Sequence, residues 1–337
     1  MQTAVLGATT WGTTLAMLLA GKGVPVTLLA RTQEEARHLA STGEHRVVLH
    51  GIPFPPSLSV AAVDSYPLED ARAIAIAVPS ASMRANLRRI EGRVSRGVLL
   101  VSASKGLEVG TGLRMSQVIT EELGEAVCGR LCVLSGPNLA SEVARGLPAV
   151  AVMASKNLAA AEDARDLFMA PTFRVYTNPD LIGVEMGGSL KNIIALGAGI
   201  CDGLCYGDNA KAALVTRGLA EITRLGVAMG ARPATFAGLA GLGDLVTTCA
   251  SPLSRNHYLG EQLAKGRTLS DILASMVNVA EGVNTTRAAR EMAQTMGIDM
   301  PITELMYRVL FQGMEPRRAV VELMLREAKS ELEDWEA

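Results

Sequence analysis

The feature that most constrains the fold is a series of short apolar runs that alternate with helical patterns through the first half of the chain. These runs lie at residues 3–7, 24–30, 73–78, 98–102, 131–135 and 149–153. Each has the length of a β-strand, and apolar residues fill it almost without interruption. Such strands are typical of a parallel sheet that helices cover on both faces, because neither face meets water. We therefore predict a doubly wound, mainly parallel α/β domain.

Helical patterns replace the strand signals from about residue 183 onward. They cover residues 184–200, 208–230, 233–240, 256–265, 268–275, 284–296, 301–311 and 316–334. Pro301 and Pro316 stand in the first turns of two of these helices, where proline's fixed φ and missing N–H donor are tolerated. A chain of 337 residues is also too long for one ordinary core. We expect a dinucleotide-binding domain over residues 1–180 and an all-α domain over residues 181–337, and we interpret the proline-bearing stretch 51–57 as a surface excursion.

Composition argues against several classes of function. The net charge of −2 leaves no polybasic surface for nucleic acid or an anionic membrane. No basic, cleavable leader precedes the first strand and no apolar stretch has membrane length, so we expect a soluble cytoplasmic protein. The five cysteines never form Cys-x-x-Cys, and the four histidines do not accompany them at ligand spacing. We expect neither a disulfide framework nor a metal site.

A glycine turn joins the first strand to the first helical pattern and reads Gly7-Ala-Thr-Thr-Trp-Gly12. A Gly-x-Gly-x-x-Gly turn at such a junction binds a dinucleotide, because the second glycine lets the pyrophosphate approach N–H groups at the helix N-terminus. Here Thr9 occupies the position of the second glycine, so its side chain either crowds the phosphates or donates a hydrogen bond to one. The turn favours a Rossmann-type domain, with a plain strand-to-helix turn as the alternative.

The end of the second strand carries a clue to the cofactor. An acidic residue there would bind the ribose 2′-hydroxyl of NADH, whereas an arginine accommodates the 2′-phosphate of NADPH. This chain has Arg31 at that point, and Glu34 and Glu35 follow as the expected opening of the next helix. NADPH is therefore slightly favoured over NADH, with an ordinary surface arginine as the alternative.

Lys191 interrupts an apolar, glycine-rich stretch that runs from Val184 to Ala198. If this stretch is helical, Gly187 and Gly188 share a stripe with the lysine, and another backbone or a ligand can approach closely there. A desolvated lysine seeks an anion, and its pKa falls toward the range useful for proton transfer. Lys191 is therefore a candidate catalytic acid. The alternative is a lysine whose stem follows the core and whose tip reaches water or a carboxylate.

Four further segments accompany the glycine-rich helix, namely residues 102–108 (SASKGLE), 135–142 (SGPNLASE), 238–249 (GLAGLGDLVTTC) and 254–256 (SRN). Together with residues 187–192 they closely resemble the NAD(P)-dependent glycerol-3-phosphate dehydrogenases of the bacterial cytoplasmic type. The resemblance extends from the first strand to Pro301-Ile-Thr-Glu304 and beyond. It implies reversible reduction of dihydroxyacetone phosphate to sn-glycerol 3-phosphate for glycerophospholipid synthesis, NADPH or NADH as the cofactor, and a homodimer.

The resemblance also assigns roles by position. Lys191 corresponds to the catalytic lysine, with Lys105 and Asp244 as further catalytic groups. Substrate positions are Lys105, Gly136, Asn138, Lys191, Asn192, Asp244, Thr248, Ser254, Arg255 and Asn256. Cofactor positions are Gly7, Thr10, Trp11, Gly12, Arg31, Lys105, Ala140, Arg255, Val279 and Glu281. The chain departs from the family at Thr9 and at Val48–His50, which puts cofactor affinity and preference in doubt more than the chemistry.

These residue types suit the reduction of a phosphorylated ketone. Hydride addition leaves negative charge on the ketone oxygen, so a proton donor such as Lys191 is needed within reach. Asp244 would hold an ammonium in place, although a helix cap or a structural ion pair is its alternative role. Arg255 offers the forked, permanent charge that a phosphate calls for. The competing hypotheses are a related reductase of another small hydroxy acid or phosphorylated ketone, and a non-catalytic nucleotide-binding paralogue.

Overall fold

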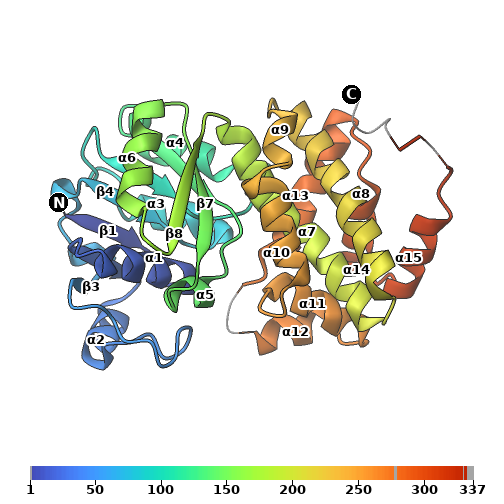
Figure 1. Ribbon diagram of the computed structural model, residues 1–337, viewed down its shortest axis with the longest axis horizontal. Coiled ribbons are helices and arrows are strands. Elements are labelled where there is room, and N and C mark those ends of the chain that lie inside the picture. Colours follow the sequence, from blue (N-terminus) through green and yellow to red (C-terminus); the bar gives the residue numbers. More distant parts are fainter. Residues whose placement is uncertain (1, 277–278, 329, 332–337) are drawn as a thin grey trace. The chain divides into compact units, whose positions relative to one another are not determined.

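The chain forms two compact units in the computed structural model, which describes residues 2–276, 279–328 and 330–331. The first unit comprises the residues up to Ser104 together with Met115–Leu181. The second comprises Lys105–Arg114 and the residues from Ile182 onward. The segment Lys105–Arg114 thus packs with the second unit. The predicted division, with a single boundary near residue 180, placed this segment in the first domain. The strands belong to the first unit, and helices make up the second (Figure 1).

Within the described residues, the first unit holds an eight-stranded sheet with the order β3-β2-β1-β4-β5-β6-β7-β8. Its strands are β1 (Thr3–Leu6), β2 (Val26–Ala30), β3 (Leu58–Ala62), β4 (Ala73–Ile76), β5 (Leu99–Ser102), β6 (Leu131–Ser135), β7 (Ala149–Ala154) and β8 (Phe173–Asn178). Neighbouring strands are parallel except for β6 and β7, which are antiparallel. The predicted fold class, a mainly parallel Rossmann-type sheet, is confirmed.

Helices cover both faces of this sheet. They are α1 (Thr10–Gly21), α2 (Gln33–Thr42), α3 (Met83–Arg88), α4 (Met115–Leu123), α5 (Ala140–Ala144) and α6 (Leu158–Phe168). Val5 of β1 lies in one buried cluster with Leu15 of α1 and Phe168 of α6. The alternate residues Ala4 and Leu6 are buried as well, with 0% and 2% exposure. The central strands are therefore apolar throughout because both of their faces are covered.

The prediction missed β3 and β8, the two strands at the ends of the sheet. In β8, buried Phe173 and Val175 alternate with exposed Arg174 and Tyr176, so the strand lacks the continuous apolar run of its neighbours. Strand β3 follows the proline-bearing stretch and is only partly buried. One-sided or partial burial allows polar residues into a strand and removes the signal on which the prediction relied.

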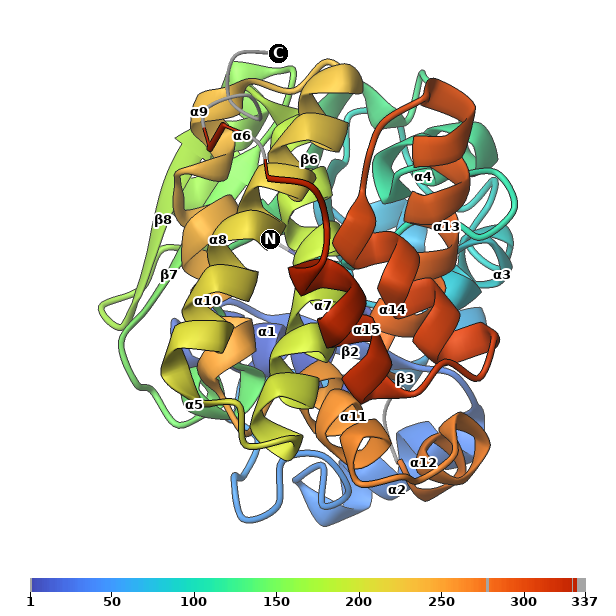
Figure 2. The same cartoon turned by 90° about the vertical axis from the view of Figure 1, so that its right-hand side faces the viewer.

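The second unit is helical. Its helices are α7 (Leu181–Gly203), α8 (Gly207–Ala228), α9 (Pro233–Phe236), α10 (Asp244–Ala250), α11 (Arg255–Ala264), α12 (Leu269–Ser275), α13 (Glu281–Met296), α14 (Pro301–Phe311) and α15 (Pro316–Met324), with a π-helical turn at Leu239–Gly243. Helix α7 supplies much of the core, since Leu190, Ala195 and Leu196 are fully buried. Figure 2 shows α14 between α13 and α15, and it contacts both.

Two of the predicted helical ranges were wrong at their ends. The range 233–240 stops at Phe236, because the following glycine-rich run forms the π-helical turn that leads into α10. The range 316–334 stops at Met324, and Arg326 beyond it donates to Asp299 Oδ2 over 2.8 Å. Residues 329 and 332–334 of that range lie outside the described residues. Among the described residues no single helix is long and apolar enough to cross a membrane, whereas one bent pair, residues 233–250 with 255–264, passes on length and composition alone.

Candidate active site

The centre of the candidate site is a buried ion pair between helices α7 and α10. Lys191 Nζ donates to Asp244 Oδ1 and, over 2.7 Å, to Thr248 Oγ1. Thr248 Oγ1 in turn donates to the backbone carbonyl of Asp244 over 2.6 Å, one turn earlier in α10. The exposed fractions are 6% for Lys191 and 1% for Asp244. Lys191 thus has a carboxylate partner inside the protein. Its second hydrogen bond, to Thr248, fixes the orientation of the ammonium group.

Lys105 brings a second positive charge to the same carboxylate. Its Nζ lies 2.6 Å from Asp244 Oδ2, while Lys191 binds the other oxygen. The Lys105 side chain is 20% exposed and that of Lys191 is 8% exposed. The structure therefore brings together the three residues predicted to be catalytic, and the cluster carries one net positive charge when both lysines are protonated.

Burial tunes the acidity of this cluster. It lowers the pKa of Lys191 to about 8, an effect that Asp244 opposes and Lys105 reinforces. Cys249, on the turn of α10 after Thr248, is also buried, and desolvation raises the pKa of its thiol to about 12. Lys191 can therefore exchange a proton near neutral pH, whereas Cys249 stays a neutral thiol.

Glycines let the neighbouring backbones reach α7. A Cβ on Gly187 would lie 2.7 Å from the carbonyl oxygen of Ala240 in the π-helical turn, just before Asp244. Farther along α7, a Cβ on Gly199 would lie 1.9 Å from the carbonyl oxygen of His257 in α11. The small-residue positions were predicted to admit either a backbone or a ligand. At Gly187, one of those positions, a backbone occupies the space, and this approach brings Asp244 close to Lys191.

Asparagines link α7 to two other helices. Asn256 Nδ2 in α11 donates to Asn192 Oδ1 over 2.8 Å, and Gly282 N in α13 donates to Asn256 Oδ1 over 2.9 Å. Asn192 and Asn256 are nearly buried, with 6% and 7% exposure. This chain fixes Asn192 beside Lys191, and it fixes the first turns of α11 and α13.

The first turn of α11 offers groups that suit an anion. Arg255 is exposed at its first position, and the N-cap residue Ser254 accepts a hydrogen bond from His257 N over 3.3 Å. Glu281, at the start of α13, interacts electrostatically with Arg255. Val279 is 44% exposed. Ser254, Arg255 and Glu281 thus lie at the N-terminus of a ten-residue helix, where the helix dipole also favours negative charge.

The remaining predicted residues belong to the first unit. Gly7 has φ +111°, and a Cβ on Gly12 would lie 2.0 Å from the Gly7 carbonyl oxygen, so this turn requires both glycines. The Thr9 hydroxyl donates to Ala77 O over 2.7 Å and accepts from Gly12 N over 3.0 Å. Thr9 is therefore the N-cap of α1. Its hydroxyl is already engaged, while the N–H groups of Thr10 and half-buried Trp11 have no partner within the helix.

Arg31 directly follows β2 and its side chain is exposed. Its backbone N–H donates to Glu35 Oε2 over 2.8 Å, and Thr32 caps α2 by accepting from Glu35 N. The prediction that the two glutamates open the next helix is confirmed, because α2 begins at Gln33 with both in its first turn. The Glu35 carboxylate thus binds the backbone N–H of Arg31 at the start of α2. The Arg31 side chain itself is exposed at the end of β2.

A second glycine turn follows β6. Gly136 has φ +129°, and Asn138 Nδ2 donates to Val150 O over 2.9 Å. Asn138 Oδ1 is buried without a partner among the described residues. Ala140 begins α5 and accepts from Thr14 Oγ1 of α1 over 3.1 Å. These turns suit a bound dinucleotide, because they combine two close backbone approaches with an orphaned buried acceptor.

Some polar contacts escaped the prediction. His45, in the excursion after α2, lies 3.0 Å from Ala8 O through Nε2 and so reaches the glycine turn. Asp202 at the end of α7 binds both His257 Nε2 and Lys211 Nζ over 2.7 Å. No local pattern marks the contacts of His45 with Ala8 and of Asp202 with His257, since each joins distant positions. Among the described residues, no group of three or more His, Cys, Asp or Glu is placed to hold a metal ion.

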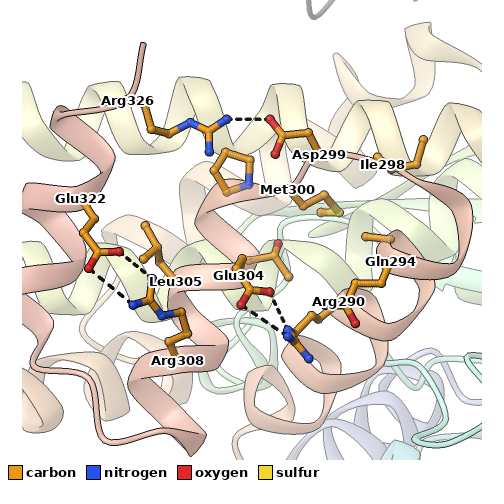
Figure 3. Close-up of a pocket in the computed structure, with 13 residues that line it drawn as sticks. Arg290, Gln294, Ile298, Asp299, Met300, Glu304, Leu305, Arg308, Glu322 and Arg326 are labelled. Atoms are coloured by element: carbon orange, nitrogen blue, oxygen red, sulfur yellow. Dashed lines mark hydrogen bonds and ion pairs between the residues drawn. The ribbon is translucent and has the colours of Figure 1, made fainter.

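A cavity of about 360 Å³ also lies in the second unit, between α13, α14 and α15 (Figure 3). Its charged lining forms three pairs, Arg290 with Glu304, Arg308 with Glu322 and Arg326 with Asp299. None of the predicted site residues lines it. The three arginines balance three carboxylates, so the cavity has no preference for an anion.

A Rossmann-type sheet with a dinucleotide turn, followed by a helical unit with a buried Lys–Asp–Lys cluster, defines a nicotinamide-dependent dehydrogenase. Family models of the N-terminus and C-terminus of NAD-dependent glycerol-3-phosphate dehydrogenase match residues 2–161 and 180–321. The chain belongs to this family, and the predicted resemblance is confirmed.

Individual relatives agree along nearly the whole chain. It is 52% identical over 329 residues to a protein of Dehalococcoides mccartyi named glycerol-3-phosphate dehydrogenase (NAD(P)+), covering 97% of this chain and 92% of that one. A protein of the same name from Pelotomaculum thermopropionicum is 48% identical over 331 residues, covering 98% and 95%. The crystal structure of glycerol-3-phosphate dehydrogenase from Coxiella burnetii is similar with a TM-score of 0.91 and 37% identity, covering 96% and 99%.

Proposed function

We propose that the chain catalyses the reversible NAD(P)H-dependent reduction of dihydroxyacetone phosphate to sn-glycerol 3-phosphate, with Lys191 as the proton donor and acceptor. The observation that carries the proposal is the buried Lys191 ammonium, held by Asp244 and Thr248 with Lys105 on the second carboxylate oxygen. A buried cation of lowered pKa is the group that a ketone oxygen needs when it gains negative charge. Family membership directs the proposal to this substrate.

The reaction divides the work between cofactor and protein. When bound, the reduced nicotinamide supplies a hydride, which the ketone carbon accepts. Lys191 gives its proton to the ketone oxygen, and the product is a secondary alcohol with NAD(P)+. Lys105 adds positive charge at the site while the oxygen carries its charge. In the reverse direction neutral Lys191 takes the proton back.

The phosphate of the substrate would bind at the first turn of α11. Arg255 is exposed there, and a guanidinium donates two parallel hydrogen bonds to a phosphate. Ser254 and Asn256 flank it, and the bonds of Asn256 to Asn192 and Gly282 fix the turn. The same turn follows α7 and α10 in the helical core, so phosphate and proton donor are served by one unit.

NADPH is the preferred cofactor in this proposal. The support is Arg31, an exposed cation directly after β2 where a 2′-phosphate is recognised, together with the engagement of Glu35 in the α2 cap. The glycine turn and the N–H groups of Thr10 and Trp11 would hold the pyrophosphate. A homodimer, a cytoplasmic location and a role in glycerophospholipid synthesis are further parts of the proposal, and they rest on the family resemblance.

The decisive test follows NADPH absorbance with dihydroxyacetone phosphate and then with dihydroxyacetone. We expect oxidation with the phosphorylated ketone alone. Comparable rates with both ketones would favour a related reductase, and no oxidation with either would favour a non-catalytic paralogue. Lys191→Ala should abolish turnover while NADPH still quenches protein fluorescence. Lys265→Ala removes an exposed lysine of the same unit and serves as the matched control. Near-normal turnover of Lys191→Ala would end the assignment.

A further inference from the structure

The segment Lys105–Arg114 is a closed loop with an anchor at each end. It leaves the first unit after β5 and returns to it at α4, yet it packs within the second unit. Leu107 and Arg114 form an antiparallel bridge, and Glu108 N donates to Leu113 O over 2.9 Å. The bridge brings the two ends of the loop together, so a constraint on Arg114 is also a constraint on the backbone next to Lys105.

The Arg114 anchor is a buried ion pair that the reaction itself does not use. Arg114 Nη1 donates to Glu185 Oε2 of α7, and the two residues are 7% and 6% exposed. Glu185 precedes Lys191 by six residues, which is about 9 Å along one rigid helix. The same helix therefore carries the proton donor and the partner of Arg114.

Two apolar contacts reinforce the attachment. Leu107 is 1% exposed and belongs to the same buried cluster as Met186 and Leu190 of α7. Gly112, at φ +69°, approaches α13 so closely that a Cβ there would lie 2.9 Å from Met292 Cγ. Leu107 and the Arg114–Glu185 ion pair thus fix the loop on α7, and Gly112 packs against α13, so the loop has little freedom to move along α7.

We propose that Arg114 and Glu185 are positioning residues for Lys105: their ion pair fixes the loop on α7 and so holds the Lys105 ammonium against Asp244. The proposal rests on the proposed function. A lysine has a long, flexible side chain, and its contact with a carboxylate depends on a fixed backbone. A buried ion pair is well suited to fix one register, because the other carboxylate of α7, Asp202, lies at the far end of the helix and binds His257 and Lys211.

The test is the double variant Arg114→Met/Glu185→Met. It removes both charges together and leaves neither unpaired, so the fold is retained more readily than in a single variant. We expect kcat/KM for dihydroxyacetone phosphate to fall about tenfold or more. Circular dichroism and the melting temperature report on folding. The double variant Arg308→Met/Glu322→Met removes a more exposed Arg–Glu pair at the cavity of Figure 3 and should leave kcat/KM unchanged.

A pH profile distinguishes the positioning of Lys105 from a purely structural role of the Arg114–Glu185 pair. The charged groups that act on Lys191 are Asp244 and Lys105, with the neutral Cys249 thiol beside them, and Lys105 lowers the pKa of Lys191. If the loop releases Lys105, the alkaline limb of kcat/KM for ketone reduction moves to higher pH, in the direction that Lys105→Met also gives. An unchanged kcat/KM, or a loss without movement of this limb, would overturn the proposal. Absence of turnover in the parent protein would instead refute the proposed function.

Discussion

Asp244 holds both lysines, so Asp244→Asn is the most informative single change. The asparagine keeps the shape of the side chain and one hydrogen-bond acceptor but loses the negative charge. That charge opposes the burial that lowers the pKa of Lys191 to about 8. Its removal leaves burial and Lys105 acting together, so the pKa of Lys191 must fall further. Ketone reduction needs the protonated lysine and should therefore lose its alkaline range.

The structure sets the size of this effect. An opposite charge in direct contact is worth on the order of 4 kcal/mol at an effective dielectric constant near 20. At ~1.4 kcal/mol per pKa unit this corresponds to a fall of about three units in the pKa of Lys191. We expect a fall of about two units, because the amide oxygen of the asparagine still accepts a hydrogen bond. At pH 7, a lysine of pKa about 8 is about nine-tenths protonated, and one of pKa about 6 is about one-tenth protonated. The expected loss of kcat/KM at pH 7 is therefore about tenfold from protonation alone.

The assay is kcat/KM for NADPH-dependent reduction of dihydroxyacetone phosphate between pH 5 and 9. We expect the alkaline limb of Asp244→Asn to move about two units below that of the parent, so that the variant recovers activity toward pH 5.5. Asp299→Asn removes a carboxylate from an exposed pair in the same unit and should leave the limb in place. An alkaline limb that stays near pH 8, or moves upward, would refute the electrostatic reasoning.

Three further predictions concern other parts of the chain. Arg255→Lys keeps the positive charge but loses the two-pronged guanidinium, so KM for dihydroxyacetone phosphate should rise about tenfold or more. The melting temperature measured without NADPH should be unchanged. Thr9→Val keeps the branched shape but removes the hydroxyl that caps α1, and urea unfolding should show a loss of about 1 kcal/mol; an unchanged stability would contradict the capping role. Burial raises the pKa of Glu221 to about 7, although Ile302 N and the Thr303 N–H and hydroxyl groups donate to it. The folded state then binds the extra proton between pH 4.5 and 7, so this residue makes stability fall as pH rises through that window. Glu221→Gln should flatten that slope in pH-dependent urea unfolding.

The sequence predicted the elements whose burial is uniform and missed those whose burial is partial. Strands β1, β4 and β5 are covered on both faces, and continuous apolar runs marked them. Strand β8 alternates buried and exposed side chains, and the six-residue strand passed unnoticed. Glycine-rich residues 238–243 were assigned in part to a helix, but close backbone packing against α7 decides their conformation. Such packing is a tertiary property that local periodicity does not contain.

The candidate site was predictable in its charges and not in its geometry. An isolated lysine in an apolar helix indicates a buried cation, and this reasoning found Lys191 without its partner. Asp244 lies 53 positions away, and the family resemblance supplied the link. Glu185 lies in the same apolar stretch as Lys191, but its partner Arg114 is 71 positions away and looks like an ordinary surface charge in the sequence. An ion pair becomes visible only when the fold has brought its two halves together.

One carboxylate performs two tasks at this site, and the geometry explains why both are needed. Burial alone would lower the pKa of Lys191 until the proton was lost at neutral pH, and no donor would remain for the ketone. Asp244 prevents this while Thr248 holds the ammonium over 2.7 Å in a fixed direction. Charge and position are therefore coupled through Asp244. A variant that keeps the charge but lengthens the arm, Asp244→Glu, should retain an alkaline limb near that of the parent and lose kcat through misplacement. That outcome would separate the two tasks that Asp244→Asn removes together.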